Sequence, residues 1–224
     1  MLLQSKVKAA KRSYREFCGV AKALDVVGER WTLLIVRNLL VGGQRYKDLL
    51  DSLPGITTNL LAARLRELTA AGLVVQRELP PPAASTIYEL TPPGRELEPV
   101  VFALGQFGAR YMLGKGPSRS EHTHIRWMMV ALKRRYRGSE REAVVSLQAE
   151  GHAFRLRLGA KALEVDGGSP LSGDDARVRA DGATLRSLLF EGVSARSLIG
   201  RGLIEVDGDR EAFLALVQAV GAVT

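Results

Sequence analysis

The segment from residue 30 to residue 72 constrains the fold of this chain more than any other part of the sequence. Residues 30–41 are apolar almost all round, which is typical of a helix buried in a core. Gly42 and Gly43 follow and predict the end of that helix. Residues 45–51 then predict a second, short helix that turns its leucines inward.

A tight turn and a longer helix complete this segment. The sequence Leu53-Pro54-Gly55 predicts the turn, because proline fixes one backbone dihedral and glycine accepts a positive one. Thr57 or Thr58 supplies a hydroxyl that can cap the next helix, and Gly72 is well placed to end it. A short helix, a tight turn and a longer helix form a helix-turn-helix.

The longer helix has two different faces. At about 100° per residue, one face carries Leu61, Leu65 and Leu68. The opposite face carries Asn59, Ala63, Arg66 and Ala70. Asparagine can pair with adenine, arginine can pair with guanine or phosphate, and alanine allows close approach. This face predicts a DNA-reading surface, and the alternative is the solvated face of an ordinary amphipathic helix.

A hairpin follows the longer helix. Residues 73–77 and 86–90 have the composition of strands, and the proline-rich residues 79–85 between them predict a protruding loop. A helix-turn-helix followed by such a hairpin is a winged helix.

The next predicted helix begins at Thr91, with two prolines in its first turn. Its apolar stripe consists of Leu97, Val101, Leu104, Phe107 and Tyr111. A small domain would struggle to cover this stripe, so we expect self-association through it. The alternative is that a second domain or the N-terminal helix of the same chain covers it.

Residues 17–111 resemble the HxlR family of winged-helix regulators. The resemblance rests on Cys18 and on residues 27–35, 43–49, 56–68, 72–74 and 88–91. It implies homodimers on palindromic double-stranded DNA, with the longer helix in the major groove and the hairpin along the backbone or minor groove. The residues expected at the DNA are Arg45, Thr57, Thr58, Asn59, Ala63, Arg64, Arg66 and Arg77.

Two positions depart from the family pattern. The wing residues 80–85 carry no basic side chain, which leaves only Arg77 nearby and puts wing contacts in doubt. Phe107 stands where the family often has tryptophan, which keeps aromatic packing but loses an indole donor.

Cys18 is the only cysteine of the chain, so it cannot form an intramolecular disulfide. It aligns with a cysteine that some HxlR relatives use to sense oxidants or electrophiles. A redox role requires exposure and a lowered pKa. The favoured alternative is a small buried side chain.

The sequence 113–118 combines glycines with a proline and predicts a boundary between domains 1–114 and 115–224. Residues 152–158 alternate strictly between apolar and polar, as in a half-buried strand, and further short strand and helix patterns follow. The fold class expected is therefore α+β, a winged helix followed by a small α+β domain.

The second domain is similar to the end of sterol-carrier-protein-like domains over residues 176–182, 185–192 and 202–209. This resemblance implies a hydrophobic ligand held between a sheet and its helices. The residues expected to line its site are Phe154, Leu156, Leu189, Phe190 and Phe213. The alternative is an ordinary filled core.

Net charge is +8, of which the first 114 residues carry +5, and a basic balance attracts polyanions. The basic end of residues 121–137 is expected to be a solvated helix end. No apolar run is long enough for a bilayer or a signal peptide, so we expect a cytoplasmic protein. No motif indicates catalysis, a metal or a cofactor.

These patterns predict a DNA-binding transcriptional regulator. The resemblances further imply a homodimeric repressor on a palindromic operator, which a hydrophobic ligand would modulate. The alternative is a lipid carrier or scaffold protein that uses its winged helix only for self-association.

Overall fold

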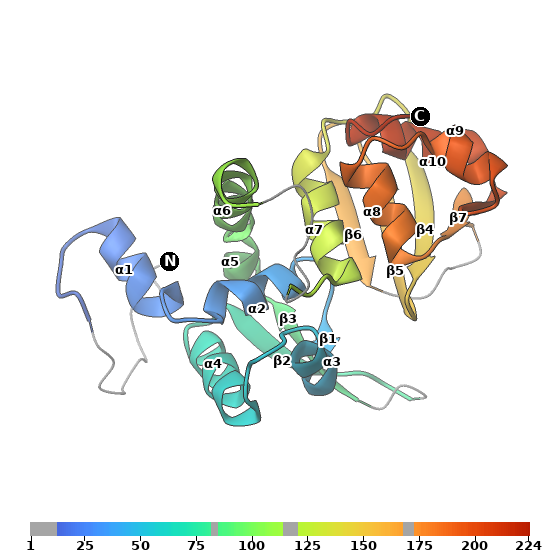
Figure 1. Cartoon of the computed structure of the whole chain (residues 1–224). Helices are drawn as coiled ribbons and strands as arrows, with labels where there is room; N and C mark the ends of the chain where they lie inside the picture. The colour runs from blue at the N-terminus through green and yellow to red at the C-terminus, as the bar shows by residue number, and fades with distance from the viewer. Residues whose placement is uncertain (1–12, 82–84, 114–120, 168–172) are drawn as a thin grey trace. The chain divides into compact units, whose positions relative to one another are not determined.

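A computed structural model describes residues 13–81, 85–113, 121–167 and 173–224 of the chain. The chain divides into two compact units, Met1–Ser118 and Arg119–Thr224, each of which is described by itself (Figure 1). The predicted boundary after residue 114 lies outside the described residues and stays a prediction.

Helices make up most of the first unit. They are α1 (Gly19–Val27), α2 (Thr32–Leu39), α3 (Tyr46–Asp51), α4 (Thr58–Ala70), α5 (Pro92–Arg95) and α6 (Glu98–Tyr111). The predicted helix-turn-helix is confirmed as α3 and α4. Thr57 caps α4, and Gly72, with φ of +73°, ends it in a backbone conformation that favours glycine.

A small antiparallel sheet completes this unit. Its strands β1 (Gln44–Arg45), β2 (Val74–Glu78) and β3 (Thr86–Leu90) lie in the order β1-β3-β2. The hairpin of β2 and β3 confirms the predicted wing. The strand β1 was not predicted, because two residues are too few to show an alternating pattern.

The last helix of the first unit was predicted as one and is two, α5 and α6. Thr91 Oγ1 accepts a hydrogen bond from the Gly94 backbone at 3.2 Å and donates one to the Gly72 carbonyl at 2.6 Å. A β-carbon on Gly94 would lie 2.0 Å from the Leu73 carbonyl oxygen. This close approach fixes α5 against the base of the wing, and α6 begins a new turn beyond it.

The described residues of the second unit form one mixed five-stranded sheet and four helices. Its elements are α7 (Ile125–Arg135), β4 (Ala143–Ala149), β5 (His152–Leu158), β6 (Leu163–Gly167), β7 (Ala176–Arg179), α8 (Gly182–Phe190), α9 (Ala195–Gly200), β8 (Glu205–Gly208) and α10 (Arg210–Ala219). The strand order is β6-β5-β4-β7-β8, in which β4 and β7 are parallel and the other neighbours antiparallel. Asp209 caps α10, as predicted.

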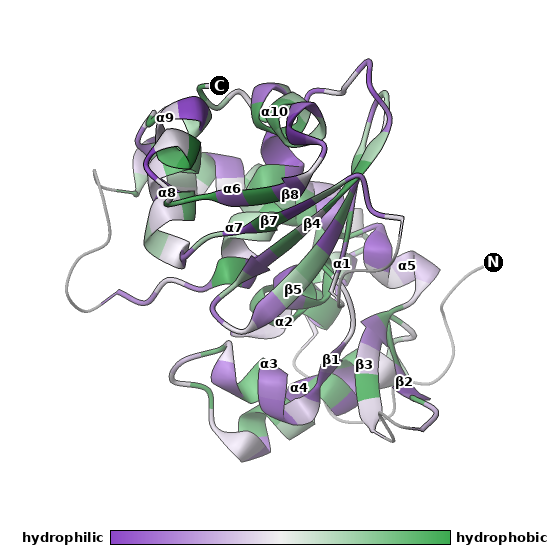
Figure 2. Ribbon diagram, turned by 90° about the vertical axis from the view of Figure 1, so that its right-hand side faces the viewer, coloured by the Kyte–Doolittle hydropathy of each residue, from purple (hydrophilic) through white to green (hydrophobic). Residues whose placement is uncertain are grey.

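The two faces of this sheet differ in polarity. Phe154, Leu156 and Leu158 of β5 are buried, whereas Arg155 and Arg157 between them point to the other face. Figure 2 shows the alternation as purple and green bands along the strands. The sheet therefore buries one apolar face and leaves one charged face open.

The residues predicted to line a ligand site differ in their burial. Phe154, Leu156, Leu189 and Phe213 are buried in the apolar layer, whereas Phe190 is 47% exposed. A surface hollow of about 640 Å³ lies elsewhere in this unit, beside the turn between β4 and β5, and its lining is largely polar or backbone. Whether a ligand enters the apolar layer stays a prediction.

The basic end of α7 is not simply solvated, so that expectation was wrong for Arg135. Its guanidinium donates hydrogen bonds to the carbonyls of Leu189, Val220 and Gly221. These carbonyls lie at the C-terminal ends of α8 and α10, where a cation complements the helix dipoles. Arg135 therefore joins three helices of the unit.

Candidate nucleic-acid interface

The apolar face of α4 anchors this helix in the core of the first unit. Leu61, Leu65 and Leu68 are at most 2% exposed and pack with residues of α2, α3 and the strands. Tyr46 of α3 donates a hydrogen bond from its hydroxyl to the Thr58 carbonyl at 2.6 Å. The start of α4 is therefore tied to α3.

A buried polar network fixes the helix that precedes this pair. Asn38 of α2 donates a hydrogen bond to Ser52 Oγ at 2.8 Å, and Gln44 Nε2 donates one to the Asn38 carbonyl at 2.9 Å. All three side chains are buried. The sequence pattern did not predict this network, although an asparagine in a mostly apolar helix indicates a buried polar contact.

The opposite face of α4 is free of the core. Asn59, Arg66 and Ala70 are exposed, and Ala63 is half-buried. Among the described residues, none forms an ion pair with Arg66. Arg45, which precedes α3, is also exposed. An asparagine and an arginine on one solvent-facing helix surface can donate and accept hydrogen bonds at base edges.

Two threonines, Thr57 and Thr58, lie at the N-terminus of α4. Thr57 Oγ1 accepts a hydrogen bond from the Leu60 backbone at 3.3 Å, so this hydroxyl caps the helix. Both Thr57 and Thr58 are exposed. They lie beside the helix N-terminus, which favours contact with phosphate.

Arg64 differs from the other predicted DNA contacts. Its Nη2 lies 3.0 Å from Glu29 Oε2 and its Nη1 lies 2.5 Å from Glu67 Oε2. The side chain is only 14% exposed. The structure therefore directs Arg64 toward carboxylates of its own chain, away from the face that carries Asn59 and Arg66.

The one cation at the wing is also paired. Arg77 donates two hydrogen bonds to the Glu89 carboxylate, and this interaction holds the pKa of Glu89 below its usual range. Residues 78–94 contain no lysine or arginine. Among the predicted contacts, Arg45 and Arg66 are therefore the cations that remain available to bind DNA phosphates.

Cys18 is exposed, so the prediction of a small buried side chain was wrong. It stands at the N-terminus of α1, where the N–H groups of Ala21 and Val20 lower the pKa of the thiol without an aligned capping hydrogen bond. Both conditions for a reactive thiol, exposure and a lowered pKa, are met.

The helix α6 leaves an apolar surface in solvent. Leu97 and Val101 pack against the core of the first unit, but no residue of α6 is buried. The exposed apolar side chains of α6, which we call the α6 stripe, are Val100, Leu104, Phe107 and Tyr111, at 44% to 64%. The helix α1 lies apart from α6 (Figure 1). Within this unit, α1 therefore does not cover the stripe.

Two other features, a metal-binding cluster and a membrane-spanning helix, are absent from the part of the chain that the structure describes. No group of three or more histidines, cysteines or carboxylates there could hold a metal ion. Within the same residues, no helix combines the length and the apolar character needed to cross a membrane.

The helix-turn-helix of α3 and α4 agrees with the comparisons. Residues 26–115 match the model of the HxlR-like helix-turn-helix family. The chain is 36% identical over 98 residues to an uncharacterized helix-turn-helix transcriptional regulator of Synechocystis, covering 42% of this chain and 70% of that protein. This chain belongs to the HxlR-like family. It is accordingly a helix-turn-helix transcriptional regulator, and its family is not one of enzymes.

Other transcriptional regulators also match part of this chain. YvaP of Bacillus subtilis, also an uncharacterized helix-turn-helix transcriptional regulator, is 32% identical over 91 residues, which are 41% of this chain and 84% of YvaP. Among solved structures, the reduced form of YodB from B. subtilis is 32% identical and covers 46% of this chain and all of that chain, with a TM-score of 0.38. The family match ends at residue 115, so the sterol-carrier resemblance of the second unit stays a prediction.

Proposed function

We propose that this HxlR-like chain is a homodimeric repressor that binds palindromic double-stranded DNA through α4. The observation that carries the proposal is the exposed face of α4, on which Asn59 and Arg66 are free while the opposite face is locked in the core. Base edges are read by such side chains in the major groove, and Thr57, Thr58 and Arg45 lie where phosphates would run.

The α6 stripe supports self-association. Four exposed apolar side chains in successive turns of one helix are typical of a surface that a partner covers. A second copy would supply an identical stripe, and a two-fold dimer would present two α4 helices to two half-sites. The palindromic operator follows from this symmetry.

The second unit supplies the place for a hydrophobic ligand in this proposal. Its sheet and helices enclose an apolar layer that contains Phe154, Leu156, Leu189 and Phe213. A ligand that enters this layer would displace contacts between these side chains. It would regulate DNA binding only if its affinity differs between the DNA-competent and incompetent states.

A second function is favoured by the state of the wing. Because Arg77 is paired with Glu89, the described wing offers phosphate no free cation, which would suit a lipid carrier or scaffold that uses the winged helix only for self-association. The dependence of DNA affinity on salt concentration distinguishes the two functions. Counterion release makes true DNA affinity fall linearly with the logarithm of salt concentration, whereas self-association need not.

Selection from a pool of random duplexes tests the proposal. A regulator retains a palindromic sequence at moderate salt, and sequencing the retained duplexes gives the operator. Retention of no palindrome while the chain still dimerises would favour the scaffold function.

A further inference from the structure

The turn between α1 and α2 makes two separate contacts, one with α4 and one with the turn that precedes α4. In its first half, Glu29 Oε2 lies 3.0 Å from Nη2 of Arg64, which is in the middle of α4. These residues are 35 positions apart in the sequence. Glu67, one turn further along α4, accepts from the other terminal nitrogen of Arg64.

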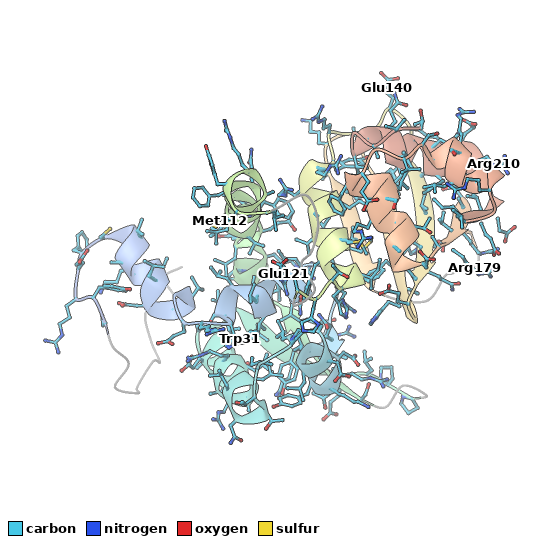
Figure 3. All side chains as sticks on the ribbon, in the orientation of Figure 1. Trp31, Met112, Glu121, Glu140, Arg179 and Arg210 are labelled. Carbon is cyan, nitrogen blue, oxygen red and sulfur yellow. The ribbon has the colours of Figure 1, made fainter. Side chains whose placement is uncertain are left out.

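In its second half, the turn places Trp31 against the approach to α4. A β-carbon on Gly55 would lie 3.7 Å from Cη2 of Trp31, so the indole faces the tight turn that leads into the helix. Figure 3 labels Trp31 between α2 and α4. The same short turn therefore contacts α4 near its centre and contacts the turn before its first residue.

The backbone of Trp31 is strained. Its φ is +80°, a conformation that bulky side chains rarely adopt and that is energetically unfavourable. A residue keeps such a backbone conformation only when the packing around it stabilises that conformation. Trp31 packs against the buried core of the first unit, and the guanidinium of Arg30 lies 5.3 Å from the ring.

The pair of Glu29 and Arg64 is poorly suited to stability alone. The Nε atom of Arg64 is buried and has no hydrogen-bond partner among the described residues, and an unsatisfied buried donor is destabilising. An apolar side chain of similar length would pack there without that penalty. Glu29 is 47% exposed, so solvent screens the pair and its contribution to stability is small.

Geometry matters at this place because base reading tolerates little displacement. Asn59 and Arg66 are seven residues apart, which is about 10 Å along a helix. A tilt of about 10° would move one relative to the other by about 1.7 Å, more than the spread of ordinary hydrogen-bond lengths. Phosphate contacts of flexible side chains tolerate such a tilt better than bidentate base contacts.

We propose that Glu29 and Arg64 are positioning residues, which set the orientation of α4 so that Asn59 and Arg66 reach base edges together. This inference rests on the proposed function, because it assigns Arg64 to the DNA-reading helix but not to the DNA. The turn that contains the strained Trp31 is rigid, and the ion pair of Glu29 and Arg64 attaches α4 to this turn.

The variants Glu29→Gln, Arg64→Met and Arg64→Lys test the pair. Affinity is measured for two duplexes at one salt concentration, the sequence that the unaltered chain selects from a random pool and a scrambled duplex of the same composition. We expect Glu29→Gln and Arg64→Met each to weaken binding to the selected duplex about tenfold and binding to the scrambled duplex less than twofold. The double variant should be no worse than Arg64→Met, and Arg64→Lys should retain most of the preference.

A matched control removes an ion pair elsewhere. Glu191→Gln breaks the pair with Arg186, whose atoms are also 3.0 Å apart, in the second unit, and it should leave both affinities unchanged. Equal losses on the two duplexes, or additive losses in the double variant, would overturn the positioning role. Thermal unfolding of each variant identifies any that fail to fold.

A measurement without DNA separates this inference from the proposed function. Amide hydrogen exchange of α4 should accelerate in Glu29→Gln relative to Glu191→Gln, because α4 loses its ion pair with the turn between α1 and α2. Unchanged exchange would overturn the positioning role, even if the chain binds DNA. If the unaltered chain shows no preference between duplexes, the proposed function fails, while exchange still decides whether Glu29 holds α4.

Discussion

Arg77 in β2 donates hydrogen bonds from Nε at 2.9 Å and from Nη2 at 2.7 Å to the carboxylate of Glu89 in β3. The wing therefore contains a cation whose charge is already balanced. Removing the carboxylate should release it. We expect Glu89→Gln to strengthen DNA binding and to steepen the slope of log affinity against log salt by about 0.9, the value for one added phosphate contact.

Titrations at several salt concentrations measure this slope. The matched control is the double variant Arg77→Ala/Glu89→Gln, which removes both charges together and should change neither the affinity nor the slope appreciably. A large loss of affinity in this double variant would show instead that Arg77 leaves Glu89 to contact the DNA.

The α6 stripe predicts the oligomeric state. Phe107→Glu places a charge among exposed apolar side chains, and a dimer that buries them would have to desolvate that charge. We expect a monomer by sedimentation, with an unchanged thermal midpoint for the first unit because Phe107 is not buried. The control is Gln106→Glu on the neighbouring position, and a dimer that survives Phe107→Glu would exclude the stripe as its interface.

Cys18 should react at lower pH than an ordinary thiol. Its pKa is lowered in the folded chain, so thiolate forms at lower pH than in the unfolded chain and persists as pH rises. The rate of alkylation by iodoacetamide, followed from pH 6 to 10, should therefore have its midpoint below that of the same chain in denaturant. Coincident midpoints would contradict the effect of the α1 N-terminus.

Cys18→Ser tests what that reactivity does. We expect unchanged DNA affinity in reducing buffer, because no predicted contact uses the thiol. Release of DNA by peroxide from the unaltered chain but not from Cys18→Ser would establish a redox role.

The elements that sequence could predict are those with local signals. Thr57 and Gly72 mark the two ends of α4, and the alternating residues of β5 identify its buried face. The partners of charged side chains were not predictable. Arg64 is next to the buried leucines on the helical wheel as well as to the solvent, and only its pairing with Glu29, far away in sequence, decides where it points.

The same limit applies to Arg135 and Cys18. A run of basic residues at a helix end does not show which carbonyls lie nearby, so the capping of α8 and α10 by Arg135 appears only in the folded chain. A cysteine is buried more often than not, and the exposure of Cys18 depends on how α1 leaves the rest of its unit.

A hydrophobic ligand, if it regulates DNA binding, must obey reciprocity. DNA should change the dissociation constant of the ligand by the factor by which the ligand changes that of DNA, typically about 5- to 150-fold. Titration of a fluorescent fatty acid with and without the selected duplex measures both. If the fatty-acid titration curves are equal with and without DNA, or if binding does not saturate, the second unit does not regulate DNA binding through such a ligand.

Parallel selections from one random duplex pool show whether the exposed face of α4 reads DNA sequence. The unaltered chain and Arg66→Ala are each used to select duplexes at moderate salt, and the retained sequences are compared position by position. We expect one palindrome for the unaltered chain and, for Arg66→Ala, loss of preference at a single symmetric pair of positions, worth about 1–3 kcal/mol. Identical preferences for the two proteins, or no palindrome for either, would mean that this face of α4 does not read the sequence.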